Sequence, residues 1–172
     1  MAQPKTPLLT VDCVIFDSQG RVLLVRRKNP PYQGDFALPG GFVEVGETAE
    51  AACRREVLEE TAVKVTRLRL SGVYSDPKRD ERGHTCSVVF LAEAWRGKPR
   101  AGDDAADVAW VAGWRKAKLA FDHHKIIADA LQLHQSGEGL KPEPGKIDAR
   151  GKQPRAAPAD GRGTKKPPSP AA

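Results

Sequence analysis

Three glutamates, Glu56, Glu59 and Glu60, are the residues in this chain whose type and spacing best suit chemistry. In an α-helix each residue advances about 100°, so these carboxylates share one face that is about 100° wide. Small apolar residues that would pack the same helix, Cys53 and Val57 among them, project in line with the acids. Clustered like charges repel, and partly buried carboxylates are costly unless they are paired. Mg²⁺, or Mn²⁺ in its place, is a natural partner for such oxygen ligands, although a solvated acidic patch would show the same triplet.

A glycine-rich loop precedes the acids and favours the metal interpretation. Gly40, Gly41 and Gly46 permit tight turns and close approach of a ligand to the backbone. A backbone carbonyl and phosphate oxygens could then share a metal ion with the carboxylates. Thr48 is suited to cap a helix that runs to about Thr61, which would carry the three acids near its end.

The loop and helix together form a longer pattern. Residues 41–63 closely resemble the Nudix box, G-x5-E-x7-R-E-U-x-E-E-x-G-U, in which U is aliphatic. One fixed position differs, because Ala62 stands where the family has a glycine. That glycine helps the chain leave the helix, and the left-handed conformation costs alanine about 1 kcal/mol. The departure therefore concerns the helix exit, and no ligand of the box is lost.

The resemblance implies both a fold and a reaction. The fold is an α/β/α sandwich with a mixed sheet, in which the box forms a loop–helix–loop. The reaction is a metal-dependent hydrolysis, in which water attacks phosphorus in a nucleoside diphosphate that is linked to another moiety. By this analogy Glu56, Glu59 and Glu60 are the metal ligands and, with Arg55, the catalytic group.

Further residues would support this group by the same analogy. The carbonyl of Gly40 is an additional metal ligand, and Glu47 would join Arg55 in orienting the carboxylates. Glu44 is a further candidate for the metal network. The general base stays open between a box glutamate and an acid from a distant loop. Four acids outside the box are candidates for it: Glu81, Glu93, Asp103 and Asp104.

The substrate is indicated by a second resemblance. Residues 72–84 are similar to the segment that follows the box in small ADP-ribose pyrophosphatases, including a proline, Pro77, fourteen residues beyond the box. The similarity covers roughly residues 5–134 and implies cleavage of ADP-ribose to AMP and ribose 5-phosphate. Arg79 and Arg82 are candidate cations for the diphosphate or the terminal ribose phosphate, or else part of an exposed polar loop. Tyr74 is a candidate for stacking on adenine, or else a core residue.

The elements that must position these residues alternate between strand and helix patterns. Extended segments and two helices are expected at residues 10–16, 21–27, 36–38, 42–44, 48–61 (helix), 63–74, 85–95, 107–111 and 122–134 (helix). The first two segments flank the turn residues 17–20 and are predicted to form a hairpin. The last helix has a broad apolar stripe, which predicts that it packs on the sheet.

Charge and composition divide the chain into a domain and a tail. The chain has 172 residues and a net charge of +6, but residues 137–172 alone hold eight Lys or Arg against four Asp or Glu. That segment also holds seven of the fourteen prolines, so we predict a Nudix domain at 1–136 and a disordered basic tail at 137–172. With no apolar run long enough for a membrane and no signal sequence, the expected location is the cytoplasm. The expected partner is a nucleotide, and relatives suggest a homodimer.

Three other functions are weighed against ADP-ribose hydrolysis. The same chemistry would serve a hydrolase of oxidised nucleoside triphosphates such as 8-oxo-dGTP. A Nudix-derived regulator that senses ADP-ribose without cutting it would be expected to have an eroded box and a DNA-binding domain. A module that binds nucleic acid specifically would need an aromatic platform or a basic helix, and the sequence shows neither.

Overall fold

The computed structural model describes residues 5–102 and 105–136. Their elements run in the order β1 (Leu8–Val14), β2 (Val22–Arg27), β3 (Phe36–Ala37), β4 (Gly40–Phe42), α1 (Ala49–Thr61), β5 (Lys64–Tyr74), β6 (Thr85–Arg96), β7 (Ala105–Val111), a single 3-10 turn η1 (Trp114–Lys116) and α2 (His123–Gln135). These elements match the predicted segments closely and confirm the α/β class. The predicted tail and the base candidates Asp103 and Asp104 lie outside the described residues.

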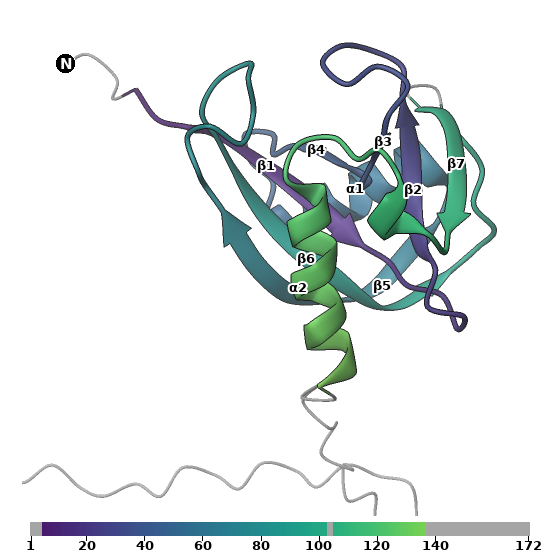
Figure 1. The fold of residues 1–172 in the computed structure, drawn as a ribbon. Helices are drawn as coiled ribbons and strands as arrows, with labels where there is room; N and C mark the ends of the chain where they lie inside the picture. Colours follow the sequence, from purple (N-terminus) through teal and green to yellow (C-terminus); the bar gives the residue numbers. More distant parts are fainter. Residues whose placement is uncertain (1–4, 103–104, 137–172) are drawn as a thin grey trace, which may run out of the picture. The chain divides into compact units, whose positions relative to one another are not determined.

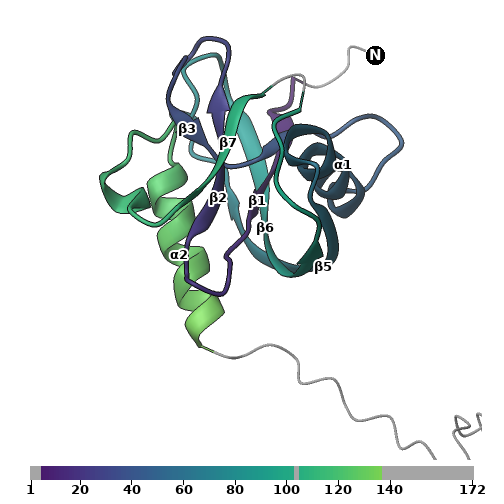
Figure 2. The ribbon, with the colours of Figure 1, turned by 90° about the vertical axis from the view of Figure 1, so that its right-hand side faces the viewer.

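The strands form two sheets. The larger has the order β4-β1-β6-β5, and the smaller has the order β3-β2-β7. Strand β1 pairs in parallel with β6, whereas its pairing with β4 and that of β5 with β6 are antiparallel, so the larger sheet is mixed as predicted. Helices α1 and α2 lie on opposite sides of the strands, as Figures 1 and 2 show.

The prediction that the first two strands pair as a hairpin is wrong, although the turn between them is present. The turn forms, because the carboxylate of Asp17 accepts hydrogen bonds from the amides of Gln19 and Arg21. A single antiparallel bridge then joins Phe16 to Val22, and the strands diverge into different sheets. The last four residues of β1 and the first four of β2 are all buried, a pattern that suits interior strands covered on both faces. Each strand is indeed interior to its own sheet, with a neighbour on both sides.

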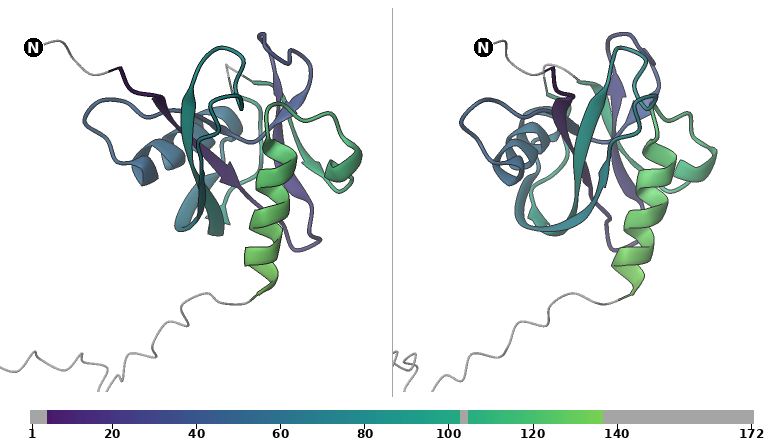
Figure 3. Two further views of the ribbon diagram at one scale, coloured as in Figure 1. Left: turned by 60° about the vertical axis from the view of Figure 1, so that its left-hand side comes forward. Right: turned by 90° about the vertical axis from the view of Figure 1, so that its left-hand side faces the viewer.

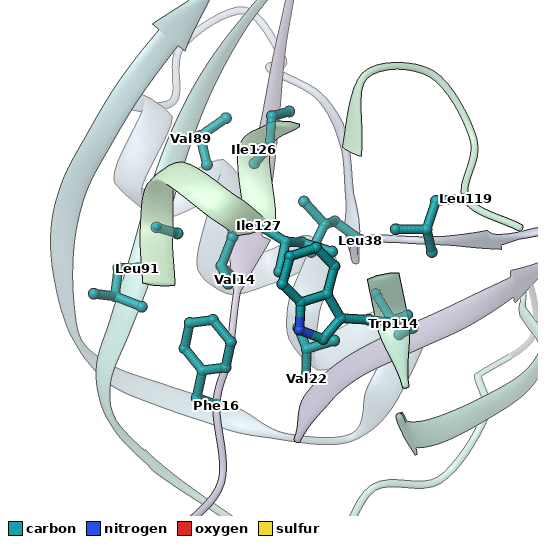
Figure 4. Close-up of a cluster of buried hydrophobic side chains, with 12 residues drawn as sticks. Val14, Phe16, Val22, Leu38, Val89, Leu91, Trp114, Leu119, Ile126 and Ile127 are labelled. Carbon is teal, nitrogen blue, oxygen red and sulfur yellow. The ribbon is translucent and has the colours of Figure 1, made fainter. Parts of the chain in front are cut away.

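Two hydrophobic clusters hold the layers together. In the first, Ile126 and Ile127 of α2 pack with Trp114 on residues of β1, β2 and β6, as Figure 4 shows. In the second, Cys53 and Val57 of α1 are buried against the other face of the larger sheet. A fully buried side chain of this size contributes roughly 1.5–3 kcal/mol, so both helices are fixed by their apolar faces. Among the described residues, no helix is long and apolar enough to span a membrane.

Loops from distant parts of the chain meet at one end of this framework. Figure 3 shows the β2–β3 loop and the β5–β6 loop at the same end of the strands, where α2 begins. The loop that carries Pro77 therefore lies near the loop that follows Arg27. This end of the strands holds the hollows described below.

Candidate active site

The helix that carries the acids begins and ends as the sequence indicates. The hydroxyl of Thr48 accepts a hydrogen bond of 3.2 Å from the amide of Ala51 and caps α1. At the other end, Ala62 adopts the left-handed conformation with φ 58° and ψ 10°, and its amide donates to the carbonyl of Leu58. Alanine thus takes the backbone shape for which the family uses glycine, at a cost of about 1 kcal/mol.

The β6–β7 loop closes the end of α1. The amide of Arg100 donates to the carbonyl of Thr61 over 2.9 Å, and the amide of Gly102 donates to that of Glu60 over 3.0 Å. These carbonyls have no partner within the helix, so the β6–β7 loop satisfies them. The loop is thereby fixed to the turn that holds Glu59 and Glu60.

The packed face of α1 decides how far each acid is buried. Cys53 and Val57 are buried as the helical wheel predicts. The side chain of Glu56 is only 16% exposed, whereas that of Glu59 is 59% exposed and extends into solvent. Burial raises the pKa of Glu56, and the negative charge of Glu59 acts in the same direction, while bonds from Arg55 oppose both.

Arg55 joins the helix to the glycine-rich loop. Its guanidinium donates to Glu47 over 2.6 Å, to Glu56 over 2.8 Å and, more weakly, to Glu59 over 3.4 Å. The bond from Arg55 lowers the pKa of Glu47. The carboxylate of Glu47 also accepts from the amide of Glu44 over 2.8 Å, while the side chain of Glu44 is exposed. The arrangement fixes the loop against the acidic face.

Gly40 and Gly41 lie so close to the acids that neither position has room for a side chain. The amide of Gly40 donates to Glu60 over 3.0 Å. A Cβ atom at Gly41 would collide with the carboxylate of Glu56, and one at Gly40 would collide with the backbone of β1. The two glycines therefore let the backbone lie directly against the acids, and we call the glycine-rich loop and these acids the cradle.

The donor set of this cradle fits a divalent cation. Within residues 5–102 and 105–136, no three His, Cys, Asp or Glu side chains converge closely enough, as they stand, to hold a metal ion. Glu56 is turned toward Arg55, and Glu60 is turned toward the amide of Gly40. A hard cation would relieve the repulsion between Glu56 and Glu59, and carboxylates with a backbone carbonyl are the oxygen ligands that Mg²⁺ and Mn²⁺ take.

Two hollows flank Gly40. The first, of about 160 Å³, is lined by Gly41, Arg27, Arg82 and Phe121 as well as Gly40. The second, of about 120 Å³, reaches Glu60. Gly40 and Arg27 line both hollows, so they form adjoining parts of one groove beside the acids.

Arg27 is a site residue that the sequence did not single out. Its guanidinium lies 5.1 Å from the ring centre of Phe121, and that of Arg82 lies 5.4 Å from the same ring. Burial lowers the pKa of Arg27, and the nearby charge of Arg82 adds to this effect. Two guanidiniums gathered around one ring make an electropositive wall in the groove.

The predicted substrate residues Arg82, Arg79 and Pro77 differ in their exposure and in their partners. Arg82 lines the groove; its side chain is 47% exposed, and its guanidinium pairs with Asp80. The side chain of Arg79 is only 5% exposed. It donates to Asp122 over 2.8 and 3.0 Å, so it is engaged within the protein although it borders the groove. Pro77 is exposed on the loop.

Tyr74 lies away from the acids. Its hydroxyl donates to Asp129 over 2.8 Å, and its ring packs on the first hydrophobic cluster. Burial and this bond raise its pKa. Tyr74 lines a larger hollow of about 690 Å³ between β5 and α2, which none of the box glutamates lines.

Two of the four candidates for the general base outside the box, Glu81 and Glu93, lie within the described residues. Glu81 is exposed on the β5–β6 loop, and Glu93 on β6 pairs with Arg67 over 3.0 Å. Asp103 and Asp104 are outside the described residues.

Known proteins share this architecture. A sequence model of the NUDIX domain matches residues 6–130. The chain is 48% identical over 126 residues to the ADP-ribose pyrophosphatase of Methanocaldococcus jannaschii, which covers 73% of this chain and 74% of that protein. It is 32% identical over 137 residues to the ADPR responsive transcriptional repressor NtrR of Acinetobacter baylyi, which covers 73% of this chain and 54% of that protein.

A solved structure agrees with these relatives. The NUDIX domain of Shewanella oneidensis NrtR, in a cocrystal with ADP ribose, matches with a TM-score of 0.70 and 33% identity, over 76% of this chain and 90% of that chain. This match and the mixed sheet confirm the predicted fold. The chain therefore belongs to the Nudix hydrolase family, as a Nudix pyrophosphohydrolase.

Proposed function

We propose that the protein hydrolyses ADP-ribose to AMP and ribose 5-phosphate with Mg²⁺, or Mn²⁺ in its place. The observation that carries the proposal is the groove that runs from Glu60 past Gly40 to two arginines, Arg27 and Arg82. A diphosphate needs cations on its oxygens and a metal site at the bond that breaks, and the groove offers both together. The 48% identity to an ADP-ribose pyrophosphatase supports this substrate.

The reaction would proceed by attack of water on phosphorus, with rupture of one P–O bond of the diphosphate bridge. Glu56, Glu59, Glu60 and the carbonyl of Gly40 would hold the metal. When bound, the metal would neutralise the diphosphate oxygens and lower the pKa of water. Arg55 holds Glu47 and Glu56 beside the glycine-rich loop, and Glu56 and Glu60 would turn from their present partners toward the metal when it binds.

A general base must accept the proton of the attacking water. Asp103 and Asp104 stay candidates for that base, as do Glu81 and Glu93. Glu93 is engaged by Arg67, and Glu81 is exposed to solvent. A box glutamate is the remaining candidate.

Arg27 and Arg82 are proposed to bind the diphosphate or the terminal ribose phosphate. Both guanidiniums are held against Phe121, which reduces the entropy lost when they grip an anion. Arg79 is proposed to act indirectly, by fixing the start of α2 through Asp122. Pro77 would stiffen the loop between these arginines and β5.

A second function, binding of ADP-ribose without cleavage, is favoured by one observation. Two of the matching proteins are a transcriptional repressor described as ADPR responsive and the NrtR domain solved with ADP ribose. The intact set of box acids in this chain argues for catalysis instead. The homodimer expected from relatives and the cytoplasmic location remain predictions.

A hydrolysis panel with ADP-ribose, NADH, diadenosine polyphosphates and 8-oxo-dGTP, with and without Mg²⁺, tests the proposal. ADP-ribose should have the highest kcat/KM and should give AMP and ribose 5-phosphate. Glu60→Gln serves as the inactive control. A tenfold lead for 8-oxo-dGTP, about 1.4 kcal/mol in transition-state stabilisation, would overturn the substrate. Tight binding of ADP-ribose with no turnover of any substrate would identify a sensor.

A further inference from the structure

A cluster of buried polar side chains lies behind Gly40 and borders the first hollow, and the proposed reaction has not yet given it a role. Asp12, Ser87 and His123 are at most 8% exposed. The hydroxyl of Ser87 donates to Asp12 over 2.5 Å, and Nε2 of His123 lies 3.5 Å from the other oxygen of Asp12. Asp12 is the β1 partner of Gly40, so the cluster borders the cradle.

His123 connects this cluster to the backbone that leads into the cradle. The amide of Leu38 donates to Nδ1 of His123 over 3.0 Å. Nδ1 must therefore lack a proton, and Nε2, which faces Asp12, carries it. Burial lowers the pKa of His123, which favours this neutral form. Leu38 is only 3% exposed, so its amide would be costly to leave without an acceptor.

The segment from Leu38 to Gly40 is held at three points. Leu38 is bonded to His123, the carbonyl of Pro39 accepts from the amide of Cys13 over 2.9 Å, and the amide of Gly40 donates to Glu60. Pro39 has no amide hydrogen, so Leu38 provides the nearest amide before Gly40. Its acceptor comes from the first turn of α2, which is 85 residues away in sequence.

We propose that His123 is a positioning residue, whose Nδ1 fixes the approach to Gly40 and so sets the geometry of the metal cradle. The ring lines the first hollow, as Asp12 does, but it does not line the second hollow, which reaches Glu60. Its effect on the cradle without substrate would therefore pass through the backbone of Leu38. The inference rests on the proposed metal site at the box glutamates. Loss of a group that orients a metal ligand typically lowers affinity or activity by about 10- to 100-fold.

Three substitutions separate the acceptor from the rest of the ring. In His123→Asn the side-chain oxygen can occupy the place of Nδ1 and keep the bond to Leu38, but the contact with Asp12 is lost. In His123→Gln the amide extends toward Asp12 instead and leaves the Leu38 amide without its acceptor. His123→Leu has similar bulk and no acceptor at all.

The first measurement is Mn²⁺ binding by electron paramagnetic resonance without substrate. The others are kcat and KM on the best substrate of the panel, and the thermal midpoint. We expect His123→Asn to stay within about threefold of the unaltered protein in Mn²⁺ affinity and kcat. His123→Gln and His123→Leu should lose at least about tenfold in both, with a smaller change in KM. If His123→Leu does not fold, the comparison of Asn with Gln decides.

The outcomes that would overturn the proposal are distinct. Equal Mn²⁺ affinity and kcat in the Asn and Gln variants, with only the thermal midpoint lowered, would reduce His123 to a structural residue. If the unaltered protein fails to bind Mn²⁺, the metal site itself is refuted and the role of His123 with it. Failure of ADP-ribose as a substrate leaves the Mn²⁺ measurement, and thus this inference, unaffected.

Discussion

Ala62→Gly should stabilise the protein, although glycine normally weakens the end of a helix. Ala62 has a φ of 58°, and the left-handed conformation costs an L-residue roughly 1–2 kcal/mol because Cβ crowds the backbone. Glycine removes that cost but gives the unfolded chain more freedom, which offsets about 0.4–1 kcal/mol. The balance is a gain of about 0.5–1 kcal/mol in the free energy of unfolding. For a domain of this size it corresponds to a rise of roughly 1–4 °C in the midpoint.

The assay is thermal and urea unfolding of Ala62→Gly beside a matched control. Ala51 is exposed and lies within α1, where the backbone is helical, so Ala51→Gly should destabilise the protein by about 1 kcal/mol. Activity should change by less than about twofold in Ala62→Gly, since the ligands of the proposed site are untouched. If Ala62→Gly destabilises the protein as much as Ala51→Gly does, the left-handed exit of α1 is wrong.

Four further predictions concern residues in and around the site. Glu60→Gln should lower Mg²⁺-dependent turnover by at least about 10²-fold with little change in thermal midpoint, and near-normal activity would contradict its role as a ligand. Arg82→Ala should weaken kcat/KM for ADP-ribose more than for a nucleoside triphosphate. Arg79→Ala should instead lower the free energy of unfolding by about 1–3 kcal/mol, because the carboxylate of Asp122 loses two charged hydrogen bonds, and urea unfolding curves of the two variants would show the difference. The pKa of His123 is lowered in the folded state. In the unfolded chain the pKa of this histidine is about 6.5, so below that pH the unfolded chain binds a proton more readily than the folded protein does. Stability should therefore fall as the pH drops from about 6.5, by at most about 1.4 kcal/mol per pH unit, and urea titrations at several pH values should show a smaller fall in His123→Asn.

The box helix could be predicted because its determinants are local. Thr48 provides the cap, the apolar residues recur with the helical period, and the glycines lie in the adjacent loop. Ala62 was likewise recognised as a departure whose effect is confined to the helix exit. Residues within α1 are related by the geometry of the helix, so the face that each side chain shares can be read from sequence spacing alone.

The groove could be predicted less completely than the box helix, because its charged side chains pair with residues that are distant in the sequence. Arg79 and Arg82 are three residues apart and equivalent in sequence, yet only Arg79 meets Asp122, 43 residues further on. The hydroxyl of Tyr74 finds Asp129, 55 residues away, and nothing near Tyr74 in the sequence reveals that partner. Arg27 was missed because it ends a strand, where an arginine is an ordinary residue. The separation of the first two strands into different sheets had the same cause, since the turn alone does not fix their partners.

The parallel pairing of β1 with β6 also governs when the cradle can form during synthesis and folding. Leu8 pairs with Thr85 and Val14 with Leu91, so the central strand of the larger sheet has no parallel neighbour until the chain has passed β6. Closing a loop of that length costs roughly 4 kcal/mol in chain entropy, which local helix formation cannot offset. A nascent chain that has emerged only as far as the β5–β6 loop would carry every residue of the box, yet the floor on which α1 packs would be unfinished. We therefore expect the long-range pairing of β1 with β6, and not the formation of the box helix, to limit the rate at which the protein folds.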